Sequence, residues 1–406
     1  MMFYNLAIYI YLLGVKIAAL FSSKPSKMIK GHREVFKVLQ QIDKNKKYIW
    51  FHAASLGEFE QGRPLIEYIR RRYPEYGILQ TFFSPSGYEV RKDYKGADVV
   101  CYLPFDTPRN AKRFVKLANP CMAFFIKYEF WQNYLGELNS RNVPVYSVSS
   151  IFRKNQIFFR WYGRDYRKVL TKFEQLFVQN ESSKKLLAKI GVTNVSVVGD
   201  TRFDRVIDIY NAAKELLLIG KFKGDSKTLV VGSSWEPDED IILKYVNENP
   251  QLKLIIAPHV VTESHINDII SKLNCKCVRF TSADEQSVKE AGCVIVDCYG
   301  LLSSIYRYGD MSYIGGGFGV GIHNVLEAAV YGIPVIFGPN NKKFREAQHL
   351  IENRGGFEIN NSDEFNGLMH KFLSDYTFLN ESGAAAGSYV KDNSGALDLI
   401  MKDIKL

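Results

Sequence analysis

The sequence predicts an α/β protein with two doubly wound, Rossmann-like domains. Short apolar runs alternate with amphipathic segments along most of the chain, which is typical of parallel sheets covered by helices. The 406 residues exceed one ordinary hydrophobic core, so two domains of somewhat under about 200 residues each are expected. A glycine-dense turn, residues 315–321, follows one of the apolar runs and indicates a ligand site in the second half.

The expected elements follow this alternation in order. Helices are expected from Gly57 to Arg72 and from Ile207 to Leu218. The polar stretch from Gly220 to Lys227 marks a boundary, which gives domains 23–220 and 221–406; whether the last helix crosses back to the first domain is left open. Because ligands bind such sheets at the carboxyl ends of the strands, we expect a cleft between the domains. The expected strands are 48–53, 77–82, 99–103, 122–126, 143–148, 176–179, 195–198, 228–232, 252–257, 277–280, 293–296, 311–314 and 335–337.

Residues 1–22 form a separate, membrane-directed part. Up to Phe21 they are apolar or aromatic except for Asn5 and Lys16, and residues 1–50 hold nine Lys and Arg against two acids, or +7 of the total +10. A secretory signal is disfavoured because no basic region precedes the apolar run. A soluble core helix remains an alternative, but an uncleaved anchor or interfacial helix beside anionic lipid on the cytoplasmic side is favoured. Whether it spans the bilayer or lies on it is left open.

Composition argues against several other classes. The excess positive charge is not accompanied by stacking aromatics or a recognition helix, so a nucleic-acid partner is not expected. The six cysteines form no CxxC pair, which fits reduced thiols and disfavours structural zinc. The acidic cluster Asp238-Glu239-Asp240 follows Pro237, where we expect a helix to begin. Acidic side chains stabilise the first turn of a helix, so we expect no metal site there, and we expect no cofactor.

The glycine-dense stretch Gly315-Gly316-Gly317 is the first candidate binding site. It follows an apolar strand and leads into a helix carrying Asn324 and Glu327, an arrangement in which backbone N–H groups approach a phosphate. Glu327 is placed to accept both hydroxyls of a ribose. The alternative is a loop that is rich in glycine only because it turns tightly.

Glu58 is the candidate for proton transfer. It follows the first strand at Ser-x-x-Glu spacing from Ser55, which is also the pattern of a helix capping box. A carboxylate at the carboxyl end of a strand can instead take a proton from a substrate hydroxyl. Both interpretations stay open, and Glu60 is a weaker candidate because it points away from Glu58 on a helix.

Three further residues follow strands of the second domain. Ser233 and Ser234 can bind phosphate through hydroxyls and amides, although Ser is also an ordinary turn residue. His259 is either a nucleotide contact or a surface histidine, and His265 is expected at the surface.

Taken together, these stretches resemble the bacterial Kdo transferases, which attach 3-deoxy-D-manno-oct-2-ulosonate (Kdo) to the lipid A precursor. The resemblance runs over nearly the whole chain and keeps the order of many blocks. These blocks are 50–58 (WFHAASLGE), 103–106 (LPFD), 129–131 (EFW), 199–204 (GDTRFD), 257–259 (APH), 315–317 (GGG) and 323–329 (HNVLEAA).

The resemblance implies a GT-B glycosyltransferase that inverts the anomeric centre, needs no metal and uses CMP-Kdo as donor. Glu58 matches the family's general base. The acceptor, a lipid A precursor such as lipid IVA in lipopolysaccharide biosynthesis, would lie against the first domain at the cytoplasmic side of the inner membrane. The implied substrate-binding residues are Ser233, Ser234, His259, Gly315, Gly316, Gly317, Asn324, Glu327, Arg202 and Glu129.

This sequence departs from the family pattern at four places. Lys127 stands where the first acid of Glu-x-Glu is usual, and Leu301 stands in a Gly-Glu-Leu block. Pro258-His259 lacks the arginine of Pro-Arg-His, and Arg202 replaces a lysine with a cation that can make two parallel bonds. These changes affect the donor contacts more than the reaction class.

Two other kinds of function fit part of the pattern. One is another GT-B enzyme that uses a UDP-sugar, including a UDP-N-acetylglucosamine 2-epimerase; the apolar N-terminus argues against the epimerase. The other is a non-catalytic, membrane-attached nucleotide-sugar binder, which needs Glu327 but not Glu58. The number of Kdo residues transferred, the acylation and phosphorylation of the acceptor and the oligomeric state do not follow from the sequence.

Overall fold

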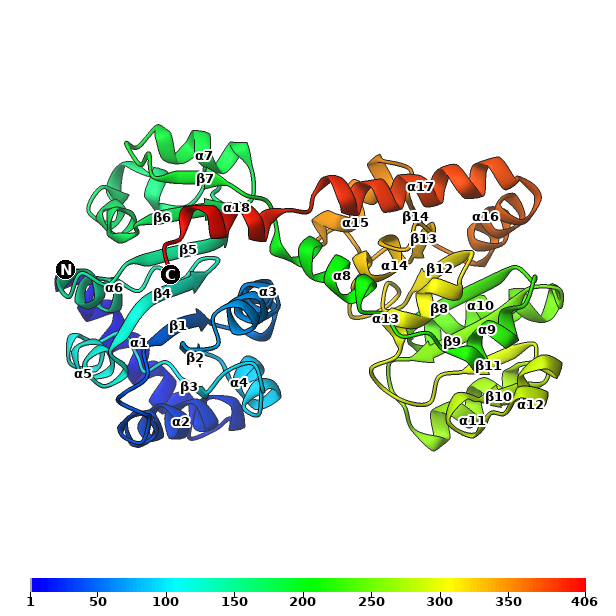
Figure 1. The fold of residues 1–406 in the computed structure, drawn as a ribbon, viewed down its shortest axis with the longest axis horizontal. Helices are drawn as coiled ribbons and strands as arrows, with labels where there is room; N and C mark the ends of the chain where they lie inside the picture. The colour runs from blue at the N-terminus through cyan, green and yellow to red at the C-terminus, as the bar shows by residue number, and fades with distance from the viewer. Residues whose placement is uncertain (1) are drawn as a thin grey trace. The chain divides into compact units, whose positions relative to one another are not determined.

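A computed structural model describes residues 2–406 and contains two α/β units (Figure 1). The first unit comprises residues 1–204 and 395–406, and the second comprises residues 205–394. Residue 1, the first of the predicted anchor, lies outside the described residues. Each unit contains a seven-stranded sheet whose strand pairs are all parallel. The α/β class and the parallel sheets predicted from the alternating apolar runs are therefore confirmed.

The first sheet has the order β3-β2-β1-β4-β5-β6-β7. Its strand order reverses between β1 and β4, which is the topological switch point where ligands of doubly wound sheets bind. Its strands are β1 Tyr48–Ala53, β2 Gly77–Phe82, β3 Val99–Tyr102, β4 Pro120–Ile126, β5 Val145–Ser150, β6 Gln175–Val178 and β7 Val195–Val197. Its helices are α1 Met2–Ala18, α2 Ser23–Gln40, α3 Leu56–Arg72, α4 Pro85–Arg91, α5 Pro108–Ala118, α6 Gln132–Ser140, α7 Glu181–Ala188 and α18 Ala396–Asp403, with 3₁₀ turns η1 Ile157–Phe159, η2 Trp161–Gly163 and η3 Tyr166–Lys172.

Both faces of this sheet are buried, so its strands are continuous apolar runs rather than alternating ones. Trp50 and Phe125 pack on the face covered by α2, α5 and α6, whereas Phe51 and Phe124 pack on the opposite face. Ile400 of α18 belongs to this second cluster, so the end of the chain completes the core of the first unit, as Figure 1 shows for the red helix.

The second sheet has the order β10-β11-β9-β8-β12-β13-β14, and its switch point lies between β8 and β12. Its strands are β8 Thr228–Ser234, β9 Lys253–Pro258, β10 Cys277–Arg279, β11 Cys293–Ile295, β12 Met311–Ile314, β13 Val335–Phe337 and β14 Gly356–Glu358. Its helices are α9 Leu217–Lys223, α10 Glu236–Glu248, α11 Glu263–Lys272, α12 Glu285–Glu290, α13 Leu302–Ile305, α14 Leu326–Ala329, α15 Arg345–Glu352, α16 Ser362–Ser374 and α17 Tyr376–Asp392, with 3₁₀ turns η4 Phe280–Ser282 and η5 Tyr306–Tyr308.

The connection between the units differs from the helix predicted over residues 207–218. Helix α8, Thr201–Asn211, ends early and α9 begins only at Leu217. Between them the Lys214 amide donates to the Ser304 hydroxyl and the Leu216 amide donates to the Tyr308 hydroxyl. Side chains of the second unit thus take amides that a continuous helix would use. The two units divide between Asp204 and Arg205, within α8, whereas the sequence predicted a boundary after residue 220.

Helix α1 is held at its start by polar side chains. The Tyr4 hydroxyl donates to Asp106 Oδ2 at 2.6 Å, and Asn133 Nδ2 donates to Asn5 Oδ1 at 2.9 Å. Asp106 also accepts the amides of Asn133 and Tyr134 at the start of α6, so one buried carboxylate joins the two helices. Elsewhere α1 exposes large apolar side chains, among them Phe3, Leu6, Ile10 and Leu13.

No helix within residues 2–406 has both the length and the apolar character needed to cross a bilayer.

Candidate active site

The switch point of the first sheet carries the candidate residues of the first unit. Ser55 and Glu58 follow β1, while Lys127, Glu129 and Trp131 follow β4, its neighbour. Parallel strands bring their carboxyl ends to the same edge, so segments distant in sequence meet there.

His52, Glu129 and Trp131 form a buried hydrogen-bond network at this edge. His52 Nε2 lies 3.1 Å from Glu129 Oε2, and the Trp131 indole N–H donates to the same oxygen at 2.5 Å. His52 Nδ1 lies 2.9 Å from Thr81 Oγ1, so both ring nitrogens have partners. Glu129, predicted to bind substrate, is therefore bonded to its own unit through Oε2 and is only 8% exposed. Its position orients His52 and Trp131.

Glu58 lies in the first turn of α3 and forms the capping interaction that the Ser55 spacing indicated. The Ser55 amide and hydroxyl both donate to Glu58 Oε2 at 2.8 Å. Both bonds use one carboxylate oxygen, and the residue is only partly buried. Capping therefore fixes the side chain but does not use its second oxygen. Glu60, in contrast, pairs with Arg91 at 2.7 Å.

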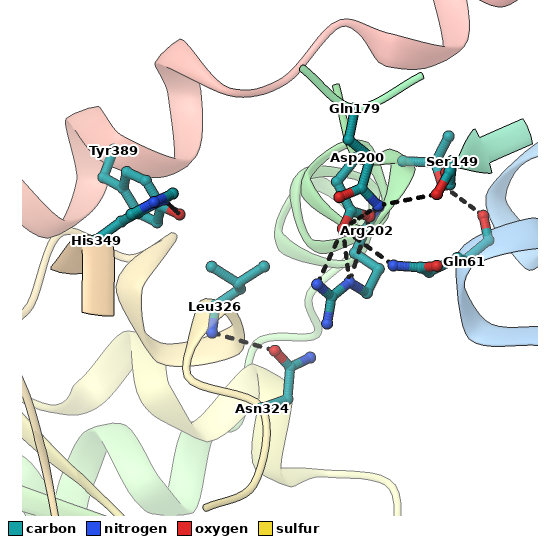
Figure 2. Close-up of polar contacts among 10 residues, drawn as sticks. Gln61, Ser149, Gln179, Asp200, Arg202, Asn324, Leu326, His349 and Tyr389 are labelled. Carbon is teal, nitrogen blue, oxygen red and sulfur yellow. Dashed lines mark hydrogen bonds and ion pairs between the residues drawn. The ribbon is translucent and has the colours of Figure 1, made fainter. Parts of the chain in front are cut away.

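Arg202 is held by Asp200 in a second polar cluster of the first unit, shown in Figure 2. Its Nη2 and Nε contact Asp200 Oδ2 at 2.9 and 3.1 Å. Gln61 and Gln179 each donate to the same oxygen at 3.1 Å. The bidentate contact expected of Arg202 is thus made here to a carboxylate of the protein.

Among the described residues, six with side chains adopt left-handed backbone conformations, and three of these lie at or near the carboxyl ends of strands. Lys127 follows β4 with φ 62°, Ser149 lies near the end of β5 with φ 58°, and Ser233 lies near the end of β8 with φ 54°. Such conformations are strained for residues other than glycine, and they concentrate at functional sites. These outliers lie on the edges where the switch points place ligands.

In the second unit, the ends of β8, β9 and β12 bring Ser233, Ser234, His259 and Gly315 together. The His259 amide donates to the Ser234 carbonyl at 2.9 Å. A Cβ on Gly315 would lie 2.3 Å from the Ser233 carbonyl oxygen, so only glycine fits. The Ser234 side chain is fully buried and donates to Glu239 Oε1 at 2.7 Å. Its hydroxyl is therefore bonded within the protein.

The glycine-rich loop differs from the predicted strand, turn and helix. The following helix, α14, contains only Leu326–Ala329, so most of residues 315–325 form an irregular loop rather than the start of a helix. The amides of Gly315 and Gly316 already donate to the Gly232 carbonyl and to Asp238 Oδ2, at 2.9 and 2.8 Å. Two of the amides expected to face a phosphate are thus bonded within the protein, and the role of this loop as a phosphate site stays a prediction.

Asp238 and Glu239 are buried neighbours of the candidate site that the sequence interpretation missed. They do lie in the first turn of α10, as expected, but each is only 1% exposed. Asp238 accepts the Tyr313 hydroxyl at 2.8 Å and the Trp235 amide at 3.0 Å, in addition to the Gly316 amide. A usable signal was their position directly behind the strand that ends in Gly232-Ser233-Ser234.

His265 is not the plain surface residue that we expected. Its Nε2 lies 2.9 Å from Glu239 Oε2, and its Nδ1 lies 2.9 Å from the Val260 carbonyl. Burial lowers the pKa of His265, but the bonded Glu239 carboxylate outweighs it and raises the pKa above its usual value. Glu239 therefore links His265 to Ser234 at the end of β8.

His259 and His323 stack with Trp235 beside the glycine-rich loop. The Trp235 and His259 rings lie 4.6 Å apart, and the His259 and His323 rings lie 4.5 Å apart. The Trp235 indole N–H donates to His323 Nε2 at 3.3 Å, which requires that nitrogen to be unprotonated. Burial, with a smaller contribution from His259, lowers the pKa of His323. His259 is the exposed member of this stack, whereas Trp235 and His323 are partly buried.

Asn324 and Glu327 lie together, as expected. Asn324 Nδ2 donates to Glu327 Oε1 at 2.9 Å, and Asn324 Oδ1 accepts the Leu326 amide at 3.2 Å (Figure 2). The same figure shows His349 and Tyr389, also of the second unit, whose Nδ1 and hydroxyl lie 3.2 Å apart.

Residues 2–406 contain no group of three or more His, Cys, Asp or Glu side chains placed to hold a metal ion.

Comparison with known proteins shows which enzymes this chain resembles. Residues 30–205 match the family model "3-Deoxy-D-manno-octulosonic-acid transferase (kdotransferase)". The 3-deoxy-D-manno-octulosonic acid transferase of Aquifex aeolicus is 29% identical over 337 residues, which cover 81% of this chain and 87% of that protein. The enzyme of the same name from Haemophilus influenzae is 27% identical and covers 88% and 86%. Over most of its length the chain is thus similar to Kdo transferases. It is accordingly a glycosyltransferase.

Solved structures place this Kdo transferase relative in a GT-B-like fold. The UDP-GlcNAc 2-epimerase of Neisseria meningitidis, bound to UDP-GlcNAc, superposes with a TM-score of 0.58 at 13% identity, covering 88% of this chain and 99% of that one. A putative epimerase of Listeria monocytogenes gives 0.53 at 12%, covering 88% and 95%. At these identities the likeness concerns the fold alone.

Proposed function

We propose that this protein transfers Kdo from CMP-Kdo to a lipid A precursor such as lipid IVA, with inversion at the anomeric carbon and without a metal ion or cofactor. The observation that carries the proposal is the similarity to Kdo transferases across both units, over 81% of the chain in one relative and 88% in another.

Glu58 acts as the general base in this proposal. An acceptor hydroxyl attacks the anomeric carbon of Kdo, its proton passes to Glu58, and the bond from that carbon to the CMP phosphate oxygen breaks with its electron pair leaving on CMP. Two features support this role: Glu58 lies beside the switch point of the first sheet, and both capping bonds use Oε2, so that Oε1 can meet the acceptor hydroxyl.

The donor binds the second unit in this proposal. Ser233, Ser234, His259, Asn324 and Glu327 lie at or beside the carboxyl ends of β8, β9 and β12, which is where nucleotides bind doubly wound sheets. Glu327 accepts the ribose hydroxyls, while Gly315, Gly316 and Gly317 permit close approach of the phosphate to the backbone, Gly316 having φ 91°. Arg202 and Glu129 complete the set of residues proposed to bind substrate.

The cytoplasmic face of the inner membrane is the proposed location. Helix α1 exposes Phe3 at 82%, Ile10 at 63% and Leu13 at 59%, and the adjoining α2 carries Lys27, Lys30 and Lys37. An apolar helix next to cations fits an interfacial helix on an anionic bilayer. Such a location would bring a lipid acceptor to the first unit.

Two measurements test the proposal with the full chain. CMP should raise the melting temperature more than UDP does, and CMP should be released from CMP-Kdo only when a lipid acceptor is present. A preference for UDP would favour a UDP-sugar enzyme or an epimerase. CMP binding without turnover would favour a non-catalytic nucleotide-sugar binder, and no stabilisation by CMP would contradict the donor assignment.

A further inference from the structure

Residues 153–168 form an exposed basic segment with aromatic residues at its tip. Six Lys and Arg face a single acid, Asp165, so the net charge of the segment is +5. Asp165 is itself paired with Lys168 at 2.9 Å. Trp161 is 88% exposed and Tyr162 is 62% exposed, which is unusual for large aromatic side chains. The exposed cations of the segment are Arg153, Lys154, Arg160, Arg164 and Lys168.

The base of this segment is anchored in the core of the first unit. Phe158 is 3% exposed and packs against Phe130 and Tyr166, with ring centroids 5.1 and 5.4 Å apart. Arg167 donates to the carbonyls of Phe158 and Arg160. Packing and hydrogen bonds at the base of the segment therefore fix its tip in an exposed position.

A glycine makes the turn at the tip possible. A Cβ on Gly163 would lie 1.8 Å from the Ile157 carbonyl oxygen, so a side chain there would open the turn. The sequence thus keeps a tight turn that presents Trp161 and Tyr162 to solvent.

The segment adjoins the start of helix α1. The rings of Tyr4 and Tyr166 lie 6.2 Å apart, and Tyr4 is bonded to Asp106 beneath them. Phe3 next to this contact is 82% exposed. The contact between Tyr4 and Tyr166 therefore joins the exposed start of α1 to the segment that carries Trp161 and Tyr162.

We infer that the tip of segment 153–168 inserts into the headgroup region of an anionic lipid bilayer as a second attachment point beside α1. The inference rests on the membrane location in the proposed function and adds to it a named surface and a lipid charge. Trp and Tyr favour the interface between headgroups and acyl chains, and clustered Arg and Lys are attracted to anionic lipid. The positive charge of the surrounding Arg and Lys side chains is complementary to the negative charge of such lipids.

Tryptophan emission of the full chain tests insertion directly. On vesicles of phosphatidylglycerol and phosphatidylcholine, brominated acyl chains should quench the parent strongly. Trp161→Phe should lose that part of the quenching while vesicle binding stays near the parent level, since Phe keeps most of the apolar surface. Equal quenching of the parent and of Trp161→Phe would overturn the inference.

Charge variants test the partner. Arg160→Gln/Arg164→Gln should bind anionic vesicles roughly 30-fold more weakly, since each cation near an anionic surface contributes about a factor of five. The matched control is Lys184→Gln/Lys185→Gln, which removes two exposed cations of α7 in the same unit and should bind like the parent. Equal affinity of the parent and of the Arg160/Arg164 variant would overturn the inference.

The α1 variant Leu6→Ser/Ile10→Ser separates this inference from the proposed location. If it abolishes vesicle binding and the segment variants match the parent, the segment inference fails while the membrane location stands. If the parent does not bind vesicles, both fail. Protection of Trp161 by a water-soluble phosphorylated glucosamine disaccharide, without any change on vesicles, would place Trp161 in an acceptor site and would also overturn the inference.

Discussion

The two sheets have the same kind of strand order but place different residues at their switch points. Between β1 and β4 the first unit presents titratable and aromatic side chains, namely His52, Glu58, Glu129 and Trp131. Between β8 and β12 the second unit presents glycine backbone bonded to Asp238, with the Trp235, His259 and His323 rings stacked beside it.

This difference separates two tasks. Proton transfer requires a carboxylate whose position is fixed but whose second oxygen can reach a substrate, which the capping of Glu58 provides. Close approach to a phosphate requires a backbone without side chains, and such a backbone must be held from outside. Asp238 does so through the Gly316 amide, Tyr313 and Trp235. In the proposed function this difference corresponds to proton transfer in the first unit and donor binding in the second.

Glu58→Gln gives the largest expected effect. Loss of the base should lower kcat by roughly 10²- to 10⁴-fold while CMP binding, measured by calorimetry, stays near the parent value. Glu60→Gln is the control on the same helix, because Glu60 is paired with Arg91. Turnover of Glu58→Gln close to the parent rate would end the division of tasks between the units.

Asp238→Asn should destabilise the protein by about 3 kcal/mol and weaken CMP binding. The change replaces an acceptor of three buried or half-buried donors, and unmatched buried donors are costly. Urea denaturation gives the free energy of unfolding. Asp240→Asn is the control: it removes an exposed partner of Lys272, worth about 0–1 kcal/mol. Equal stability of the two variants would show that the glycine-rich loop holds itself without Asp238.

Glu327→Ala should weaken CMP binding by roughly ten- to a hundredfold, the range for hydrogen bonds to a charged group. In contrast to Glu58→Gln, kcat at saturating donor should change little. Binding of 2′-deoxy-CMP gives the matching control, because it should lose affinity with the parent but not with the variant. A lowered kcat with unchanged binding would place chemistry in the second unit.

Asp204 provides a pH test with a smaller effect. Burial raises the pKa of Asp204 to about 6, against bonds from the amides of Gly395 and Ala396 that lower it. Since the folded pKa exceeds the unfolded one, this contribution to stability is full below the unfolded pKa and is lost as the pH rises through 6. The parent should therefore lose stability relative to Asp204→Asn between about pH 4.5 and about pH 6.5.

Asp98→Asn is the control for this titration. Despite partial burial, Lys46, the Ile78 amide and Arg70 lower the pKa of Asp98 to about 2. Its contribution is present above the unfolded pKa and is lost only as the pH falls toward 2, so the difference from the parent should be flat over the same range. A flat difference for Asp204→Asn as well would refute the raised pKa.

Sequence periodicity could predict most of the fold because burial on both faces makes parallel strands apolar throughout. Strands β1 and β2 begin and end as expected, whereas β14, a run of three residues with Gly356 and Glu358, carries too little apolar signal. The break between α8 and α9 was not predictable, since it depends on hydroxyls of Ser304 and Tyr308 that are distant in sequence.

The site was predictable where motifs are local. The bonds from Ser55 to Glu58 and from Asn324 to Glu327 each span three residues, which spacing can indicate. The bond from Gly316 to Asp238 spans 78 residues and that from His52 to Glu129 spans 77, so only the sheet order brings the partners together. The sequence predicted a helix after the glycines but not that α14 would be so short, which follows because glycines favour a loop over a helix.

The return of residues 395–406 to the first unit has a consequence for the order in which the protein is made. The second unit is inserted in the chain of the first, so residues 395–406 are synthesised after the whole of the second unit. Leu397 and Ile400 of α18 belong to the cluster that contains Ile49 and Phe124 of the earlier strands. The unit whose synthesis begins first therefore depends, for part of its core, on residues that are made after the whole of the second unit.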